Sequence, residues 1–229
     1  PRLIGELEHF KKSHELTFIQ FTDDDFLLRP VEELRTFAEL YKEKINVPFW
    51  IQAEAWHATD DKVALVREAG CISISMGIET GSQYILTEVM KRKTPREVTL
   101  KAFAVMHRHG IRSSANAIIG VPEETRETIF ETIELIRECE PRSINSNIFI
   151  PYDGTALKNY SISKGYLDPA YRRSVGDSWR AVLNLPGISK DEVENLARTF
   201  VLYATLPKEM WPDIEKVEKQ REQHLALEE

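Results

Sequence analysis

Short apolar runs rich in β-forming residues recur along this chain, and helical patterns fill the spaces between them. The runs are 16–21, 47–53, 71–78, 111–121 and 143–150. Proline opens helical patterns at Pro30 and Pro95, and glycine closes them at Gly70 and Gly110. This alternation predicts an α/β fold of parallel strands with helical crossovers on the outside. An open doubly wound sheet and a (β/α) barrel both fit, and five strands behind a leading helix are typical of a barrel without its first strand.

The pattern changes after the fifth run. The segment 152–186 is rich in Tyr, Ser and Asp and has no clear period. Ser189 and Glu192 then form a capping box that predicts a helix to about Tyr203, and 213–229 has the pattern of a charged amphipathic helix. We therefore expect a partial barrel over 1–157 and a mainly helical C-terminal extension over 158–229.

Composition excludes several classes of protein. Thirty basic against 37 acidic residues give a net charge of −7, which disfavours nucleic acid as a partner. No apolar stretch approaches the roughly 18 residues that cross a bilayer, and no signal peptide is visible, so we expect a cytoplasmic protein without a membrane partner. The two cysteines, Cys71 and Cys139, are expected to be packing residues. The chain also lacks the motifs of serine hydrolases and of phosphate-loop proteins.

Each predicted strand ends in acids, hydroxyls or glycines. These ends are 21–26, 52–57, 77–82, 118–125 and 151–155. A single Asp after a strand is usually a turn residue or a helix cap, but ligands of parallel α/β folds bind where strands end. Five polar ends therefore favour a ligand site on one rim. His57 is the only histidine at a strand end, and we expect it, like the other histidines, to be a surface or partly packed residue.

Four of these segments, in this order, resemble the radical S-adenosylmethionine (SAM) superfamily, and most closely its cobalamin-binding branch. They are 21–26 (FTDDDF), 77–82 (GIETGS), 120–125 (GVPEET) and 151–155 (PYDGT). One segment alone is weak evidence, whereas the ordered set on a strand–helix repeat is specific. The resemblance covers about residues 1–157 and implies a partial TIM-like barrel that binds SAM.

The resemblance implies roles for the first two segments. Asp23 and Asp24 correspond to the strand-end motif that receives the amino group of the SAM methionine. Glu79 corresponds to the residue that binds the ribose hydroxyls, with Ser82 nearby.

The later segments correspond to the adenine site. The family pattern Gly-x-Ile-x-Gly-x-x-Glu maps onto Asn116, Ile118, Gly120 and Glu123. Asn116 replaces the first glycine, which leaves the adenine contact at that position open. Pro151 and Tyr152 would approach the adenine from the last strand.

One family feature is missing from the sequence. The Cys-x-x-x-Cys-x-x-Cys motif that holds a [4Fe–4S] cluster does not occur. The resemblance therefore implies a parent enzyme with cluster ligands upstream and with SAM, and in this branch cobalamin, as cofactors. It also implies an electron donor such as flavodoxin or ferredoxin, an upstream cobalamin domain and a substrate that the sequence does not identify. We expect the chain alone to be inactive and assign it no catalytic residue and no metal ligand.

Two alternatives remain open. The acidic rim also fits a divalent-metal-dependent barrel lyase or hydrolase, with Mg²⁺ held by oxygen ligands as one form. A non-catalytic barrel scaffold would use the same strands without the chemistry.

Overall fold

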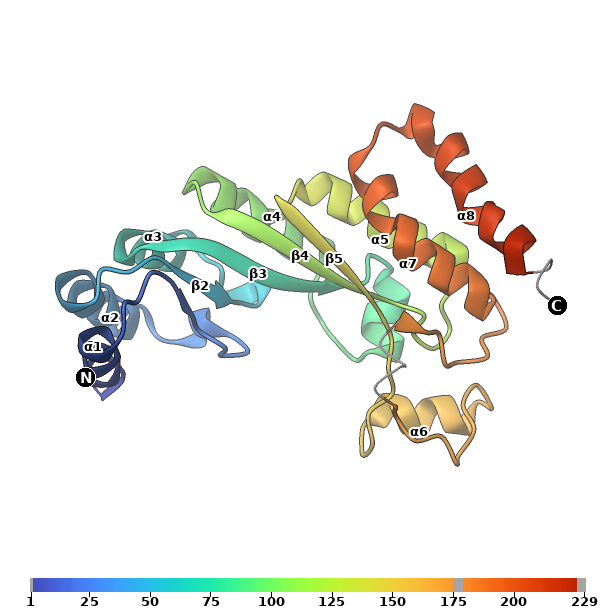
Figure 1. Ribbon diagram of the computed structural model, residues 1–229, viewed down its shortest axis with the longest axis horizontal. Coiled ribbons are helices and arrows are strands. Elements are labelled where there is room, and N and C mark those ends of the chain that lie inside the picture. The colour runs from blue at the N-terminus through green and yellow to red at the C-terminus, as the bar shows by residue number, and fades with distance from the viewer. Residues whose placement is uncertain (1, 175–178, 226–229) are drawn as a thin grey trace. The chain divides into compact units, whose positions relative to one another are not determined.

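The computed structural model describes residues 2–174 and 179–225, with a strand–helix alternation along most of the chain (Figure 1). The helices are α1 (Arg2–Ser13), α2 (Val31–Lys44), α3 (Asp60–Ala69), α4 (Arg96–Arg108), α5 (Arg126–Cys139), α6 (Ala156–Ser163), α7 (Lys190–Thr205) and α8 (Trp211–Leu225). The strands are β1 (Ile19–Gln20), β2 (Phe49–Gln52), β3 (Cys71–Glu79), β4 (Arg112–Ile119) and β5 (Ser143–Ile148). Short helical turns η1 (Phe26–Leu28), η2 (Ala55–His57), η3 (Ile85–Val89) and η5 (Lys208–Met210) lie between them.

The strands form one five-stranded sheet in the order β1-β2-β3-β4-β5. The pairs β1–β2 and β2–β3 are parallel, with Ile19 opposite Phe49 and Ile51 opposite Ile74. Sequential strands that pair in parallel need a crossover between them, and helices supply it here. The predicted repeat and its α/β class are confirmed.

Tertiary contacts divide the chain into two compact units. The first unit comprises 1–77, 97–115 and 139–143, and the second comprises 78–96, 116–138 and 144–229. The boundary that we predict at residue 157 follows the sequence pattern, and it stays a prediction.

The first unit has an aromatic core. Phe21, Phe26, Phe37, Tyr41 and Phe49 pack mutually, mostly edge to face, with ring centroids as close as 4.9 Å. The Tyr41 hydroxyl is satisfied because it donates to the Val47 carbonyl at 2.8 Å. This core fixes the loop that follows β1, since Phe21 and Phe26 bracket it.

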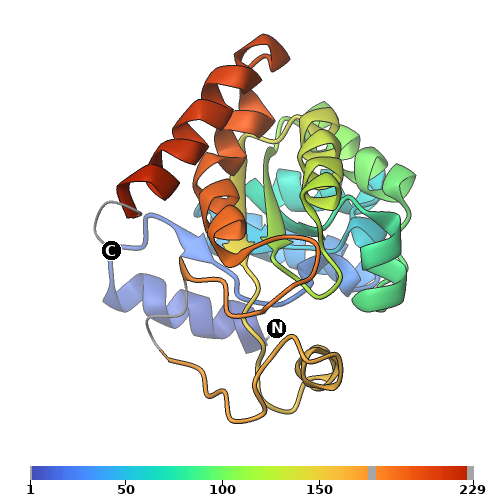
Figure 2. The same cartoon turned by 90° about the vertical axis from the view of Figure 1, so that its right-hand side faces the viewer.

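The second unit buries apolar side chains from several elements. One cluster joins Ile85, Val89, Val121, Phe149, Leu167 and Leu183. Helices α7 and α8 lie side by side in both views (Figure 1 and Figure 2). Between α5 and α8, the buried Glu218 carboxylate accepts hydrogen bonds from Arg126 at 2.6 and 3.1 Å and from the Tyr203 hydroxyl at 2.8 Å.

The sequence pattern predicts most elements to within a few residues. The predicted capping box of Ser189 and Glu192 is confirmed, and Gly70 closes α3 at a φ of 111°. Both cysteines are buried, as expected. Helix α6 lies where we predict no regular pattern, and its start is set by the Thr155 hydroxyl, which accepts from the backbone N–H of Lys158. None of the described helices is long and apolar enough to cross a membrane.

Candidate functional site

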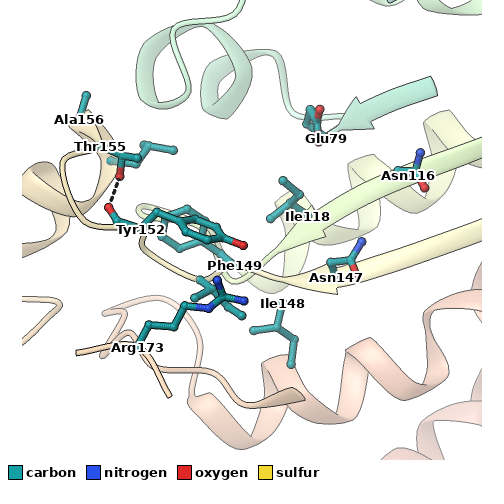
Figure 3. Close-up of a pocket in the computed structure, with 12 residues that line it drawn as sticks. Glu79, Asn116, Ile118, Asn147, Ile148, Phe149, Tyr152, Thr155, Ala156 and Arg173 are labelled. Carbon is teal, nitrogen blue, oxygen red and sulfur yellow. Dashed lines mark hydrogen bonds between the residues drawn. The ribbon is translucent and has the colours of Figure 1, made fainter. Parts of the chain in front are cut away.

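A cavity of about 630 Å³ opens in the second unit, beside the ends of β3, β4 and β5 (Figure 3). Its volume lies within the range of small-molecule sites. Half of the lining residues are apolar, namely Ile118, Ile148, Phe149, Ile150, Ala156 and Leu157. Polar groups stand around this apolar body, namely Glu79, Asn116, Asn147, Tyr152, Thr155 and Arg173. A concave lining that combines an apolar wall with convergent polar groups is typical of a site for a small organic ligand.

Glu79 ends β3 in an unusual backbone conformation. Its φ is 65°, in the left-handed region, where a side chain other than that of glycine costs about 1 kcal/mol or more. Its carboxylate is 14% exposed, and Oε1 lies 3.4 Å from a guanidinium nitrogen of Arg92. Such a conformation persists only where the surrounding structure holds it, so the end of β3 fixes the direction in which this carboxylate leaves the strand.

Gly81 shows how the turn after β3 is held. A Cβ at this position would lie 2.2 Å from the backbone oxygen of Glu131 in α5, so only glycine fits. The Gly81 N–H also donates to the Thr132 hydroxyl at 2.8 Å. The turn that carries Glu79 therefore packs directly onto the backbone of α5.

Strand β4 supplies the middle of the cavity. Asn116 and Ile118 are two residues apart and so point to the same face of the sheet. The Asn145 side chain of β5 donates to the Asn116 Oδ1 at 3.0 Å. Gly120 follows with a φ of 75°, and a Cβ there would lie 2.9 Å from Val193 Cγ1. The β4 end thus needs glycine, although Gly120 itself does not line the cavity.

Two consecutive glutamates after β4 have different surroundings. Glu123 Oε1 accepts hydrogen bonds from Tyr160 at 2.7 Å and Tyr166 at 3.1 Å and pairs with Lys164. The hydrogen bond from Tyr160 is the main cause that lowers the pKa of Glu123. Glu123 therefore anchors the α6 region, outside the lining of the cavity.

Glu124, which the sequence does not single out, holds the end of β4. It is fully buried, and its Oε2 accepts from the backbone N–H groups of Gly120 and Val121. Burial raises its pKa to about 8. The sequence shows only a pair of acids at this point, and no pattern distinguishes the buried member.

Of the remaining residues that the sequence predicts for the SAM site, one lines the cavity and the others lie outside its lining. Tyr152 lines the cavity, while Pro151 is buried beside it and does not. Ser82 is buried, and its N–H donates to the Thr80 hydroxyl at 3.2 Å. Four predicted residues therefore meet at the cavity, namely Glu79, Asn116, Ile118 and Tyr152. Ser82, Gly120, Glu123 and Pro151 support its surroundings.

The first unit holds the FTDDDF segment. Asp23 Oδ1 accepts from an Arg29 guanidinium nitrogen at 2.5 Å, and Asp24 is exposed. Asp25 caps η1 by accepting from the Leu27 N–H at 3.1 Å. Two predicted residues, Asp23 and Asp24, thus lie next to a third acid with a structural role.

Asp25 also belongs to a cluster that the sequence does not reveal. Its Oδ2 lies 2.5 Å from Nδ1 of His57, and ligand atoms of Asp25, Glu54 and His57 lie within 4.8 Å of one another. His57 is partly exposed, as expected, but it is paired with a carboxylate. Imidazole and carboxylate groups at this spacing could hold a divalent metal ion.

Comparison with known proteins identifies the family. The sequence model of the Radical SAM superfamily matches residues 2–136, more than half of the chain. The chain belongs to the radical SAM superfamily. The resemblance read from the strand-end motifs is confirmed.

This radical SAM chain has curated relatives that include a methyltransferase and a cyclase. It is 26% identical over 221 residues to an uncharacterized methyltransferase of Pyrococcus horikoshii. This match covers 93% of the present chain and 46% of the relative. It is also 26% identical over 153 residues to the anaerobic magnesium-protoporphyrin IX monomethyl ester cyclase of Rubrivivax gelatinosus. That match covers 66% of the present chain and 27% of the cyclase. The chain thus spans less than half the length of these relatives.

Among solved structures, the radical SAM methyltransferase TsrM of Kitasatospora setae, with cobalamin and a [4Fe–4S] cluster bound, is similar at a TM-score of 0.62. The identity is 16%, and the match covers 70% of this chain and 33% of TsrM. At this identity the similarity shows the fold alone. It confirms the predicted class, a partial TIM-like barrel of parallel strands.

Proposed function

We propose that this chain is the core part of a radical SAM enzyme and that the cavity of its second unit binds the adenosyl part of SAM. One observation carries the proposal: a strained carboxylate, Glu79, stands beside an apolar wall that includes Ile118 and Phe149 in a cavity of suitable size. Adenosine has the matching chemistry, with two hydroxyl donors on the ribose and a flat base. A carboxylate accepts from both hydroxyls.

The residues of this chain would divide the work of binding. Glu79 accepts the ribose hydroxyls, and Arg92 balances its charge at 3.4 Å. Ile118 and Phe149 exclude water from the base, and Asn116 offers an amide at the β4 side. The close packing of Gly81 on α5 holds Glu79 in place before the ligand arrives, which reduces the ordering cost of binding. SAM, when bound, supplies the adenosyl and methyl groups on which the superfamily's chemistry depends.

The cysteines of this chain do not fit the iron–sulfur cluster. Cys71 and Cys139 are both buried, and burial raises the pKa of Cys71 to about 12, whereas cluster ligands are thiolates. We therefore propose that the cluster is held by cysteines outside this sequence and that the chain alone does not cleave SAM.

The remaining parts of the proposal concern the whole enzyme. The curated relative named a methyltransferase supports methyl transfer as the reaction, and we propose that cobalamin carries the methyl group, as the resemblance of the strand-end motifs to the cobalamin-binding branch implies. We also propose that the whole enzyme has an upstream cobalamin domain and receives electrons from a donor such as flavodoxin or ferredoxin. Its proposed location is the cytoplasm.

Isothermal titration of the chain with SAM tests the binding site. Glu79→Gln should weaken SAM binding by 10-fold or more, because hydrogen bonds to a charged acceptor are worth about 1.5–3 kcal/mol. Glu88→Gln is the matched control, since Glu88 pairs with Lys91 on the exposed surface. Equal affinities of the wild type and Glu79→Gln, or no SAM binding by a folded chain, would reject the assignment.

A second candidate function rests on the cluster of Asp25, Glu54 and His57. Two carboxylates and an imidazole suit Zn²⁺, Mn²⁺ or Co²⁺, and a metal there would serve a barrel lyase or hydrolase. Titration with Co²⁺, followed by visible absorption, distinguishes the two functions. Stoichiometric binding that His57→Ala abolishes, together with indifference to SAM, would favour the metal-dependent enzyme.

A further inference from the structure

Arg173 lines the solvent-exposed edge of the cavity beside the exposed Tyr152, and the proposed adenosyl site does not use it. It follows α6 in the chain, and its guanidinium carbon lies 4.7 Å from the centroid of the Tyr152 ring. Figure 3 shows Arg173 reaching toward Tyr152, away from Glu79 at the end of β3. The cavity thus has a carboxylate at one end and a guanidinium at the other.

The charges of these two ends are not equivalent. The Glu79 carboxylate already has Arg92 beside it. Asp153, close to Tyr152 in the chain, pairs with Lys158 at 2.6 Å. Among the described residues, no carboxylate pairs with Arg173. The end of the cavity at Tyr152 therefore carries a positive charge without a counterion from the described part of the chain.

The setting of Arg173 suits recognition of an anion. A guanidinium held over an aromatic face keeps its N–H groups directed outward along its plane, where they match a carboxylate or a phosphate in a bidentate manner. Phe149 and Leu157 supply apolar surface in the same cavity. A ligand with an apolar body and an oxyanion fits this combination.

We propose that Arg173 binds an oxyanion of the substrate, a carboxylate or a phosphonate carried on an apolar body, in the part of the cavity next to Tyr152. This inference rests on the proposed function, since it assigns the substrate class of the same enzyme. SAM occupies the Glu79 end, and the counterion of Arg173 is the substrate.

Three small probes of similar shape test the assignment on the purified chain. They are benzoate, phenylphosphonate and the neutral benzyl alcohol, each titrated by calorimetry. Benzoate or phenylphosphonate should bind at least 10-fold more tightly than benzyl alcohol, and the preferred anion identifies the substrate's oxyanion. Arg173→Met should weaken anion binding 10-fold or more, and Arg173→Lys should recover little, because an ammonium lacks the planar fork.

Arg172→Met is the matched control. Arg172 is the neighbouring cation, but its guanidinium donates to the Pro169 and Tyr171 carbonyls at 3.3 and 2.9 Å. This variant should bind both anions as the wild type does. Unfolding curves of all variants establish that they fold.

Titration with SAM separates this inference from the proposed function. Arg173→Met should keep the wild-type affinity for SAM within twofold. Loss of SAM binding together with anion binding would assign Arg173 to SAM and overturn the inference, as would anion binding that Arg173→Met leaves unchanged. A wild type that binds the anions through Arg173 but does not bind SAM would reject the proposed function and keep the anion site.

Discussion

Replacing Glu124 with glutamine should change how the stability of the chain depends on pH. The Glu124 side chain is fully buried, its Oε2 accepts from two backbone N–H groups, and its Oε1 has no partner among the described residues. Desolvation outweighs the two hydrogen bonds and raises the pKa from 4.5 to about 8. The folded chain therefore keeps a neutral carboxyl group at the end of β4 at neutral pH.

The magnitude follows from the difference between the folded and unfolded states. Below pH 4.5 both states are protonated at Glu124, and the stability it contributes is fully present. Between pH 4.5 and 8 the unfolded chain loses this proton while the folded chain keeps it, so the free energy of unfolding falls by about 1.4 kcal/mol per pH unit. This amounts to about 3 kcal/mol between pH 5 and 7, and glutamine has no proton to lose.

Urea unfolding at pH 5, 6 and 7 measures the effect. The free energy of unfolding of Glu124→Gln minus that of the wild type should rise by about 1.4 kcal/mol per pH unit. Glu123→Gln is the control, because the Glu123 pKa is lowered and its carboxylate is ionised across this range. A difference for Glu124→Gln that is constant from pH 5 to 7 would refute the reasoning about its burial.

Three further predictions concern packing. Gly81→Ala should lower the free energy of unfolding in urea by about 2 kcal/mol or more, since the new Cβ meets backbone atoms of Glu131; wild-type stability would contradict the close approach of the two backbones. Glu218→Ala leaves Arg126 without its partner and should cost about 3 kcal/mol by the same assay, and a loss below about 1 kcal/mol would show that the pair contributes little. Cys71 should resist iodoacetamide at pH 8 in the folded chain and react in urea, because burial raises its pKa to about 12; rapid labelling without urea would exclude a buried thiol.

Local signals in the sequence explain why much of the fold could be predicted. Helix α5 carries Ile129, Ile133 and Ile136 on one stripe, and all three are fully buried. The capping box at Ser189 sets the start of α7. These features depend on residues a few positions apart, which a sequence shows directly.

The parts that could not be predicted depend on long-range packing. Asp25 and His57 are 32 positions apart, and only the folded chain brings them together. Glu123 and Glu124 are adjacent and chemically identical, yet one bonds to tyrosines near α6 and the other is buried. Helix α6 is short and only weakly amphipathic, so tertiary contacts outweigh its local pattern.

A crystal structure of the chain with S-adenosylhomocysteine tests the central claim most directly. The account predicts both ribose hydroxyls within hydrogen-bond distance of the Glu79 carboxylate and the adenine against Ile118 and Phe149, with Arg173 free of the ligand. An adenosyl group bound away from Glu79, or a cavity that stays empty at a saturating concentration of S-adenosylhomocysteine, would contradict it.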